Sequence, residues 1–353
     1  LRLKGRVLLA VEGINGTLSG DSEQIQTYMD EMAQFELIGK CGLPQDANQS
    51  RETIRPEHLF RGVDWKKSIS DISTKGSLVE PFPDLKISVV KEIISTGGSV
   101  SVEEIPRLGG THLSPSEFHQ AILENENVVL IDVRNEFEHN IGHFVNPQTR
   151  EKAMNPETVT FSSFEGTFCE RRAEELRDKK VLMYCTGGIR CEKASVMLKR
   201  RGVQDVSQLQ GGIHRYLEQY GDDGLYQGRN FVFDQRVDQN HSSQPREIVG
   251  QCIECMEPYD EISGSRICAV CRDLVLVCPS CCSRLREYHC RRHQTWKTCY
   301  YTFIDMFDQK ELEAQHQSLS TLRDSYTNKN MRRTLFRQME KVRERIKQLE
   351  EGS

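Results

Sequence analysis

The fold is decided by one stretch, Val181-Leu182-Met183-Tyr184-Cys185-Thr186-Gly187-Gly188-Ile189-Arg190-Cys191-Glu192. In it an apolar run, typical of a buried parallel strand, leads through a glycine-containing loop into residues 192–201, which have helical periodicity. Apolar runs at 128–133 and 206–209 and a helical pattern at 213–220 continue this alternation. The pattern predicts an α/β fold whose parallel sheet carries helices on both faces and binds ligands at the carboxyl ends of its strands.

Cys185 lies at the end of the predicted strand, directly before the helix. A loop folded around its sulfur aims backbone N–H groups and the helix N-terminus at that atom, and Gly187 and Gly188 permit the close approach. Together with the charge of Arg190, this environment lowers the thiol pKa and favours the nucleophilic thiolate. We therefore expect Cys185 to be a catalytic thiol that can carry a persulfide, with Arg190 beside it.

The spacing of Cys185 and Arg190 is Cys-x4-Arg. Cysteine phosphatases that hold phosphate in a comparable loop use Cys-x5-Arg, and the shorter loop suits a single sulfur atom better than a tetrahedral phosphate. Sulfur chemistry is therefore expected ahead of phosphatase activity. The alternative is a glycine-rich turn with an incidental cysteine, which the coincidence of thiol, glycines, arginine and helix disfavours.

Residues 1–96 predict a small α+β domain, which we expect to be incomplete at its start because the first strand comes almost at once. Its expected elements are a strand at 6–11, a helix at 23–35 and a strand near 85–90. Asn15-Gly16 predicts the turn of a β-hairpin, because both residues tolerate positive φ.

Glycine and proline in residues 97–116 predict a linker, after which Ser114 and Pro115 open a helix. The expected division is the α+β domain 1–96, the linker 97–116, a central domain 117–224, a cysteine-rich segment 225–300 and a charged helical tail 301–353.

Nine of the 13 cysteines lie between Cys252 and Cys299, and their CxxC pairs favour metal binding over disulfides. Two CxxC turns can enclose one zinc ion in a closed structural site. The candidate ligands are Cys252, Cys255, Cys268, Cys271, Cys278, Cys281, Cys282 and Cys290. These residues allow one or two zinc ions. In one pairing, 252 and 255 bind an ion together with 278 and 281. A second ion is then left for 268 and 271, together with Cys282 and with either Cys290 or a histidine. The pairing stays open, and an iron–sulfur cluster is the alternative.

The charged tail contains a helical seam. Leu335, Met339, Val342, Ile346 and Leu349 recur at spacings of four and three, over about two heptads. Such a seam either docks on the body of the protein or pairs with a second chain. The basic residues along it are Arg332, Arg333, Arg337, Lys341 and Arg343, which offer a weak RNA contact.

The 353 residues include 47 Lys+Arg and 52 Asp+Glu, for a formal net charge of −5. This balance excludes a generally basic coat, so RNA binding requires a local patch. Candidate patches, which we expect to be solvated helix faces, are Arg171-Arg172, Lys179-Lys180 and Lys199-Arg200-Arg201. The sequence has neither a run of about 18 apolar residues nor a signal stretch. We therefore expect an intracellular, cytoplasmic protein without a membrane partner. The missing initiator Met leaves organelle targeting open.

Five further segments accompany the loop: Glu12-Gly13-Ile14-Asn15-Gly16, Ile131-Asp132-Val133-Arg134-Asn135-Glu136, Gly142-His143-Phe144, Leu209-Gln210-Gly211-Gly212-Ile213 and Asn230-Phe231-Val232-Phe233-Asp234. Together with residues 185–195, they resemble the rhodanese-containing tRNA uridine hydroxylase family in order and spacing. The resemblance covers nearly the whole chain up to the cysteine cluster.

The resemblance implies a rhodanese-like central domain, with Cys185 as the persulfide-forming or otherwise catalytic thiol, and an N-terminal domain like acylphosphatase or ferredoxin. The other expected residues of the active loop are Thr186, Gly187, Gly188, Ile189 and Cys191. The expected supporting residues are Asp132 and Arg134, as an ion pair, together with Glu138 and His143. Glu138 and His143 could place an acid or base near Cys185, but a Gly-His-hydrophobe turn such as that of His143 is more often a packing and hydrogen-bonding device. Cys191 either resolves an oxidised Cys185 as a disulfide or faces inward from the helix.

The reaction that the resemblance implies is oxygen-dependent 5-hydroxylation of the wobble uridine, with tRNA as substrate. One alternative is a sulfurtransferase that takes sulfane sulfur from a donor such as thiosulfate, and another is a zinc-bearing adaptor without catalysis. Domains on both sides of the loop favour a macromolecular substrate and hence the first. The sequence shows no flavin, haem or nucleotide site and leaves the oligomeric state open.

Overall fold

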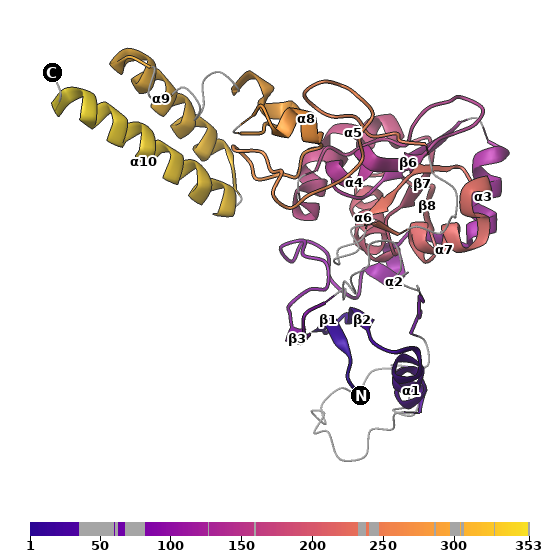
Figure 1. The fold of residues 1–353 in the computed structure, drawn as a ribbon. Helices are drawn as coiled ribbons and strands as arrows, with labels where there is room; N and C mark the ends of the chain where they lie inside the picture. Colours follow the sequence, from indigo (N-terminus) through magenta and orange to yellow (C-terminus); the bar gives the residue numbers. More distant parts are fainter. Residues whose placement is uncertain are drawn as a thin grey trace, which may run out of the picture.

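Figure 1 shows a computed structural model of the chain. The structure describes residues 1–34, 60, 63–67, 82–125, 127–158, 160–231, 238–239, 247–285, 287–296, 304, 307–327 and 329–351. The N-terminal strands lie at the bottom of Figure 1, the central sheet at the right and two C-terminal helices at the upper left. None of the helices in the described part has the length and apolar character that a membrane span requires.

The central sheet has the strand order β4-β8-β7-β5, and each neighbouring pair is parallel. Its strands are β4 (Thr111–Leu113), β5 (Val128–Asp132), β7 (Lys180–Tyr184) and β8 (Val206–Leu209). The helices around it are α3 (Pro115–Leu123), α5 (Glu170–Leu176), α6 (Ile189–Arg200) and α7 (Gly212–Tyr220). The predicted parallel α/β unit is confirmed.

Side chains of β7 alternate between two apolar cores, because successive residues of a strand point to opposite faces of a sheet. Val181 and Met183, together with Cys185 just beyond the strand, join a core that includes residues of α5 and α6. Leu182 and Tyr184 join a second core, with residues of α3 and α7. Cys185 therefore leaves the strand on the side covered by α6.

The residues expected to form a linker, 97–116, contain α2 (Ile105–Leu108) and the edge strand β4. The sheet therefore begins before residue 117, where the boundary was expected. A strand of three residues beside two glycines gives no periodic signal, and only its pairing with β8 reveals it. The predicted helix start is present: Ser114 caps α3 in a reciprocal pair with Glu117, and Pro115 occupies its first turn.

The N-terminal sheet has the order β2-β1-β3, with α1 (Ser22–Ala33) after β2. Its strands are β1 (Lys4–Ala10), β2 (Gly13–Ser19) and β3 (Leu85–Val89). The predicted turn at Asn15-Gly16 is wrong: Ala10 pairs with Gly13, so the hairpin turns at Val11-Glu12, and Gly16 pairs with Val7 inside the strands. A Cβ at position 16 would lie 2.8 Å from the carbonyl oxygen of Arg6, so this glycine serves close strand contact.

Short elements complete the structure around the sheets. They are α4 (Glu136–Ile141), β6 (Gly142–Phe144), η2 (Phe161–Ser163), η3 (Glu165–Cys169), η4 (Gly221–Asp223), β9 (Tyr226–Gly228), β10 (Asn230–Phe231), β11 (Asp238–Gln239), α8 (Pro279–Cys282) and η5 (Arg291–Trp296). β6 pairs with β9 and β10 with β11, both antiparallel.

The charged tail forms two helices, α9 (Gln309–Ser325) and α10 (Lys329–Glu351), which pack on each other and project from the rest of the molecule (Figure 1). Leu335, Met339 and Val342 of the predicted seam are buried in one core with residues of α9 and with cysteines of the cysteine-rich segment. Of the two expected arrangements, the structure shows the seam docked on the body of the chain.

Lys193 of α6 joins the N-terminal sheet to the central domain. Its side chain is 3% exposed, and its Nζ lies 2.8 Å from Glu12 Oε2 and 3.1 Å from Glu92 Oε1. It also donates to the carbonyl oxygen of Ile94 at 2.8 Å. Because Glu12 belongs to the β1–β2 turn, this ion triad fixes the N-terminal sheet against the helix that begins at the Cys185 loop.

Lys193→Met keeps an unbranched side chain but leaves two largely buried carboxylates without their cation. Breaking a buried ion pair costs about 3–5 kcal/mol, so we expect the free energy of unfolding in urea, followed by circular dichroism, to fall by that order. Lys199→Met is the control, because Lys199 Nζ donates to the carbonyl oxygen of Gly109; there the expected loss is about 1–2 kcal/mol. Equal losses in the two variants would contradict a special role for the triad.

Candidate functional site

The candidate active site is built on the turn between β7 and α6. Cys185 is 1% exposed, and its Sγ accepts a hydrogen bond from the backbone N–H of Gly188 at 3.1 Å. Burial alone would raise the pKa of this thiol. The hydrogen bond from Cys191, the charge of Arg190 and the backbone N–H groups of both residues outweigh burial and lower the pKa of Cys185 to about 5. The sulfur is therefore a thiolate at neutral pH.

Glycines let the first turn of α7 meet the Cys185 loop. Gly188 and Gly212 have φ values of +93° and +67°, a region that side chains rarely adopt. A Cβ on Gly212 would lie 2.5 Å from the carbonyl oxygen of Cys185 and 2.7 Å from two backbone nitrogens of the loop. The N–H of Ile213 donates to the Cys185 carbonyl oxygen at 3.0 Å. The loop is therefore held from outside as well as by its own backbone.

Arg190 is held in place by Glu138 of α4. Its Nη1 and Nη2 donate to the two carboxylate oxygens of Glu138 at 2.7 and 2.8 Å. Nη2 also donates to Thr186 Oγ1 at 3.1 Å. The structure therefore makes Glu138 the partner of Arg190, which differs from the free acid or base expected from the sequence.

Cys191 lies in the first turn of α6 and is fully buried. Burial raises the pKa of its thiol, and its hydrogen bond to the Cys185 sulfur raises it further. Cys191 is therefore a neutral thiol that donates to the Cys185 thiolate. This geometry matches the inward-facing alternative, because a resolving cysteine attacks as a thiolate.

Asp132 and Arg134 form an ion pair at the carboxyl end of β5, and both side chains are fully buried. Arg134 donates to the two Asp132 oxygens at 2.8 and 2.6 Å and to the carbonyl oxygen of Gly142 at 2.5 Å. Burial would raise the pKa of Asp132, but the charge of Arg134 holds it well below its usual range. Since Gly142 directly follows α4, the pair ties the end of that helix to the end of β5.

His143 of β6 is buried against His139. Its Nδ1 lies 2.9 Å from the His139 carbonyl oxygen, and the two rings stack with centroids 4.6 Å apart. Burial and the nearby His139 lower the pKa of His143 to about 4, so its ring is neutral at neutral pH. Within the described residues its Nε2 has no hydrogen-bond partner. These contacts fit a packing role for His143.

The cysteine-rich segment also holds α4, a contact that the sequence does not signal. Arg292 forms ion pairs with Glu136, the first residue of α4, and with Asp273 at 2.9 Å. Phe137 of α4 packs in a small core with Leu276. The helix that positions Arg190 therefore rests partly on the segment that carries the cysteines.

Two clusters of side chains have metal-binding geometry. The ligand atoms within each cluster lie no more than 4.8 Å apart: Cys252, Cys255, Cys278 and Cys281 form the first, and Cys268, Cys271, Cys290 and His293 form the second. The sulfur atoms of Cys255 and Cys278, and those of Cys271 and Cys290, are 3.7 Å apart. A tetrahedral zinc ion with Zn–S bonds of about 2.3 Å separates its sulfurs by about 3.8 Å. Both donor sets therefore fit zinc.

His293 stands in the second cluster where Cys282 was expected. Its Nδ1 lies 3.2 Å from Cys290 Sγ, and its Nε2 lies 3.3 Å from the Tyr326 hydroxyl, the kind of outer contact that orients a ligating histidine. Cys282 Sγ instead lies 3.5 Å from the Val277 carbonyl oxygen. Cys281 and Cys282 are neighbours in α8, so their side chains point about 100° apart and only one reaches the first cluster.

Both clusters begin on the same kind of turn. Met256 and Arg272, which follow the two CxxC pairs, have φ values of 64° and 68°. Their N–H groups donate to the carbonyl oxygens of Cys252 and Cys268 at 2.8 and 2.9 Å. Because neither residue is Gly or Asn, the sequence gives no sign of this left-handed position. Cys299 and residues 232–234, which entered the sequence interpretation, lie outside the described residues.

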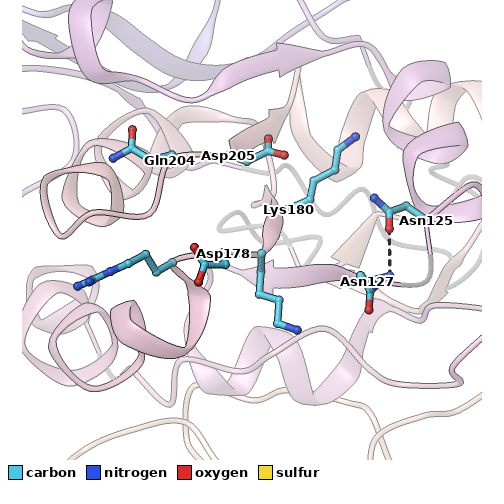
Figure 2. A pocket seen from close by; sticks show the side chains of 8 residues that line it. Asn125, Asn127, Asp178, Lys180, Gln204 and Asp205 are labelled. Carbon is cyan, nitrogen blue, oxygen red and sulfur yellow. Dashed lines mark hydrogen bonds between the residues drawn. The ribbon is translucent and has the colours of Figure 1, made fainter.

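A polar hollow of about 430 Å³ lies at the other end of the central sheet (Figure 2). Its lining residues are Asn125, Asn127, Arg177, Asp178, Lys179, Lys180, Gln204 and Asp205. Lys180 begins β7, so the hollow lies at the amino end of the strand whose carboxyl end leads to Cys185. The candidate basic patch Lys179-Lys180 therefore sits among carboxylates and away from the candidate site.

In the other candidate basic patches, three of the five cations are paired with acids. Arg172 pairs with Glu175 at 2.6 Å, Arg200 pairs with Glu104, and Arg201 pairs with Glu170 at 3.0 Å. A cation already paired with a carboxylate offers little attraction to phosphate. These helix faces are therefore poor candidates for an RNA contact.

Three family models match the chain. They are a UPF0176 acylphosphatase like domain over residues 1–93, a Rhodanese-like domain over 114–219 and a Rhodanase C-terminal domain over 227–295. The rhodanese-like match contains the Cys185 loop, and the C-terminal match contains all eight residues of the two cysteine clusters.

Relatives resemble the chain over most of its length. A tRNA uridine(34) hydroxylase of Corynebacterium diphtheriae is 34% identical over 300 residues, which are 83% of this chain and 85% of that protein. One of Corynebacterium kroppenstedtii is 35% identical over 82% of this chain and 86% of its own length. Rhodanese-like domain-containing protein 6 of Arabidopsis thaliana is 33% identical over 83% of this chain but 48% of its own length.

A pair of glycine substitutions tests the loop. We expect Gly212→Ala to displace the Cys185 loop, because its Cβ would collide with backbone atoms. Alkylation of Cys185 at pH 7, followed by mass spectrometry of its peptide, is expected to slow at least about tenfold as the thiolate loses its donors. Gly187→Ala is the matched control, since its Cβ would meet nothing within 4 Å. A normal rate in Gly212→Ala would count against the geometry of the loop.

Proposed function

We propose, since the chain belongs to the family of the tRNA uridine(34) hydroxylases, that it hydroxylates the wobble uridine of tRNA at carbon 5. The observation that carries the proposal is the complete thiolate loop. Cys185 accepts a hydrogen bond from Gly188 beside a guanidinium that Glu138 fixes. A loop with these features and a lowered thiol pKa fits a reactive cysteine rather than a buried structural one.

The residues around Cys185 have separate proposed roles. Cys185 supplies the sulfur nucleophile, and Arg190 stabilises negative charge on it. Glu138 and Thr186 position Arg190, because they accept its hydrogen bonds. Cys191 stabilises the thiolate by donation from its neutral thiol. Because the proposed substrate is tRNA, we propose that the chain acts inside the cell.

The same loop supports a persulfide on Cys185. With thiosulfate as donor, the thiolate attacks the sulfane sulfur, the S–S bond of the donor breaks with its electron pair on the leaving group, and sulfite departs. The product is the anion Cys185–S–S⁻, so the charges balance and no further oxidant is needed. The terminal sulfur carries the negative charge that Arg190 and the N–H groups of the loop stabilise.

We propose that zinc fills both cysteine clusters in a structural role. Four protein ligands in each cluster leave no position for water or substrate, which is typical of structural rather than catalytic zinc. Metal binding at such sites contributes directly to folding. The second cluster includes His293, next to Arg292, so zinc there also steadies the ion pair of Arg292 with Glu136 on α4.

Metal analysis tests both clusters. We expect two zinc ions per chain by elemental mass spectrometry, and about one in Cys255→Ser and in Cys271→Ser, since each variant removes one ligand of one cluster. Cys282→Ser is the control and is expected to keep both ions, because Cys282 lies outside both clusters. Loss of zinc from Cys282→Ser, or iron in the purified protein, would overturn this assignment.

Nucleoside mass spectrometry tests the proposed reaction. Bacterial cells that lack their own tRNA uridine(34) hydroxylase would express either this chain or its Cys185→Ser variant. We expect 5-hydroxyuridine to return with the wild type and to stay at least about a hundredfold lower with Cys185→Ser, because the variant lacks the thiolate.

One control and two contrary outcomes define the result. Cys169→Ser removes a buried cysteine outside the loop and is expected to retain activity, provided that it folds. Equal 5-hydroxyuridine from the wild type and from Cys185→Ser would refute the catalytic role of Cys185. No 5-hydroxyuridine from a folded, zinc-loaded wild type would refute the proposed reaction in that tRNA pool.

A further inference from the structure

The first half of α10 carries positive charge without any acid. Residues 326–339 contain Lys329, Arg332, Arg333 and Arg337 but no Asp or Glu. The chain as a whole has a formal net charge of −5, so this segment stands apart from its surroundings. The last of the three family matches ends at residue 295, so α10 lies outside the parts that they match.

The fold turns these cations outward. Leu335 and Met339 of the same helix are buried against α9 and the second cysteine cluster. Lys329, Arg332, Arg333 and Arg337 are exposed. Phe336 lies among them with 49% exposure. We call Lys329, Arg332, Arg333, Phe336 and Arg337 the α10 basic face.

The cations of this face are unpaired within the part of the chain that the structure describes. No hydrogen bond or ion pair joins Lys329, Arg332, Arg333 or Arg337 to another described residue, and the nearest acid along the helix is Glu340. Further along α10, Arg343 pairs with Glu340 at 2.6 Å and Lys347 pairs with Glu351 at 3.5 Å. Unsatisfied positive charge is therefore concentrated in the first half of the helix.

The α10 basic face is held firmly in place. Gln338 donates to the carbonyl oxygen of Ala269, between the two cysteines of a CxxC turn, at 2.6 Å. The Tyr326 hydroxyl lies 3.3 Å from Nε2 of His293. The first contact docks α10 and the second docks the end of α9 just before it, so both hold the cations of α10 as a fixed array beside the second cluster.

We propose that the α10 basic face binds the phosphate backbone of the tRNA substrate and that Phe336 stacks on an unpaired base of it. The proposal rests on the proposed function, since it names the surface that recruits the same substrate. The four cations span about 12 Å of helix, at 1.5 Å per residue. This length matches about three phosphates of one strand. An exposed aromatic ring among cations is the combination that single-stranded nucleic acid uses.

The other classes of partner fit less well. A membrane-binding helix inserts its apolar face, but the apolar face of α10 is buried in the core. An acidic protein would match the cations but would not need the exposed ring. Both partners remain as outcomes of the test.

The test measures how tightly the full chain binds an unmodified tRNA transcript, by fluorescence anisotropy at several salt concentrations. We expect Arg332→Ala/Arg333→Ala/Arg337→Ala to weaken binding at least tenfold. The slope of log K against log salt should become shallower by about 2, because each lost phosphate contact removes about 0.7–0.9. Phe336→Ala should weaken binding about fivefold or more with little change in slope. Phe336→Tyr keeps an aromatic ring and should bind as tightly as the wild type.

The matched control removes equal charge from cations that already have acidic partners: Arg172→Ala/Arg343→Ala/Lys347→Ala. We expect its affinity and slope to stay within about twofold of wild type, since paired surface charges contribute little. Thermal unfolding and zinc content should be unchanged in all these variants, because the substituted side chains are exposed and lie outside the metal clusters.

The remaining outcomes contradict the proposal. Equal affinity and slope for the two triple variants would overturn the α10 basic face while leaving the proposed function intact. Equally tight binding of polyglutamate or of anionic phosphatidylserine vesicles to the wild type would show that the face recognises another class of partner. A wild type that binds no tRNA and makes no 5-hydroxyuridine would refute the proposed function itself.

Discussion

The ion pair between Arg190 and Glu138 is the constraint on which the site depends. A buried thiolate is costly in free energy unless donors and a nearby cation compensate for its lost hydration. Arg190 can supply that charge in a fixed position because both of its terminal nitrogens are held by Glu138. The pair also crosses the fold, since it joins the loop after β7 to α4, so the geometry at the sulfur depends on how α4 is held.

The outer parts of the chain brace the two helices that border the loop. The N-terminal sheet reaches α6 through Glu12 and Lys193, and the cysteine-rich segment reaches α4 through Arg292 and Glu136. The Lys193–Glu12 pair is buried, and removing one partner of a buried ion pair is far more costly than the pair is stabilising, so this contact favours one arrangement of the parts over others. The cysteine clusters can therefore influence the thiolate without touching it, because they set the position of Arg292.

Local patterns in the sequence predicted the parts that depend on local forces. The apolar run before Cys185 and the helix after it follow from periodicity, and the cap at Ser114 follows from its own side-chain chemistry. Long-range pairing was not predictable: Glu138 and Arg190 are 52 residues apart, and β4 is a strand only because β8 lies beside it. The prediction of a turn at Asn15-Gly16 was wrong because the pairing of β1 and β2 decides where the hairpin turns. His293 completes the second cluster in place of Cys282 because its Nδ1 lies 3.2 Å from Cys290 Sγ, whereas Cys282 Sγ lies 3.5 Å from the Val277 carbonyl oxygen.

The most direct test of this account is the pH dependence of Cys185 alkylation, with mass spectrometry of the Cys185 peptide to separate it from the other cysteines. Since only the thiolate reacts, the rate should rise with pH and reach half its maximum near the pKa of about 5. In Arg190→Gln the midpoint should move upward, because the charge that favours the thiolate is gone, while Arg172→Gln should leave it unchanged. A wild-type rate that rises only near pH 8.5, the range of a free thiol, or an unchanged midpoint in Arg190→Gln would contradict the account.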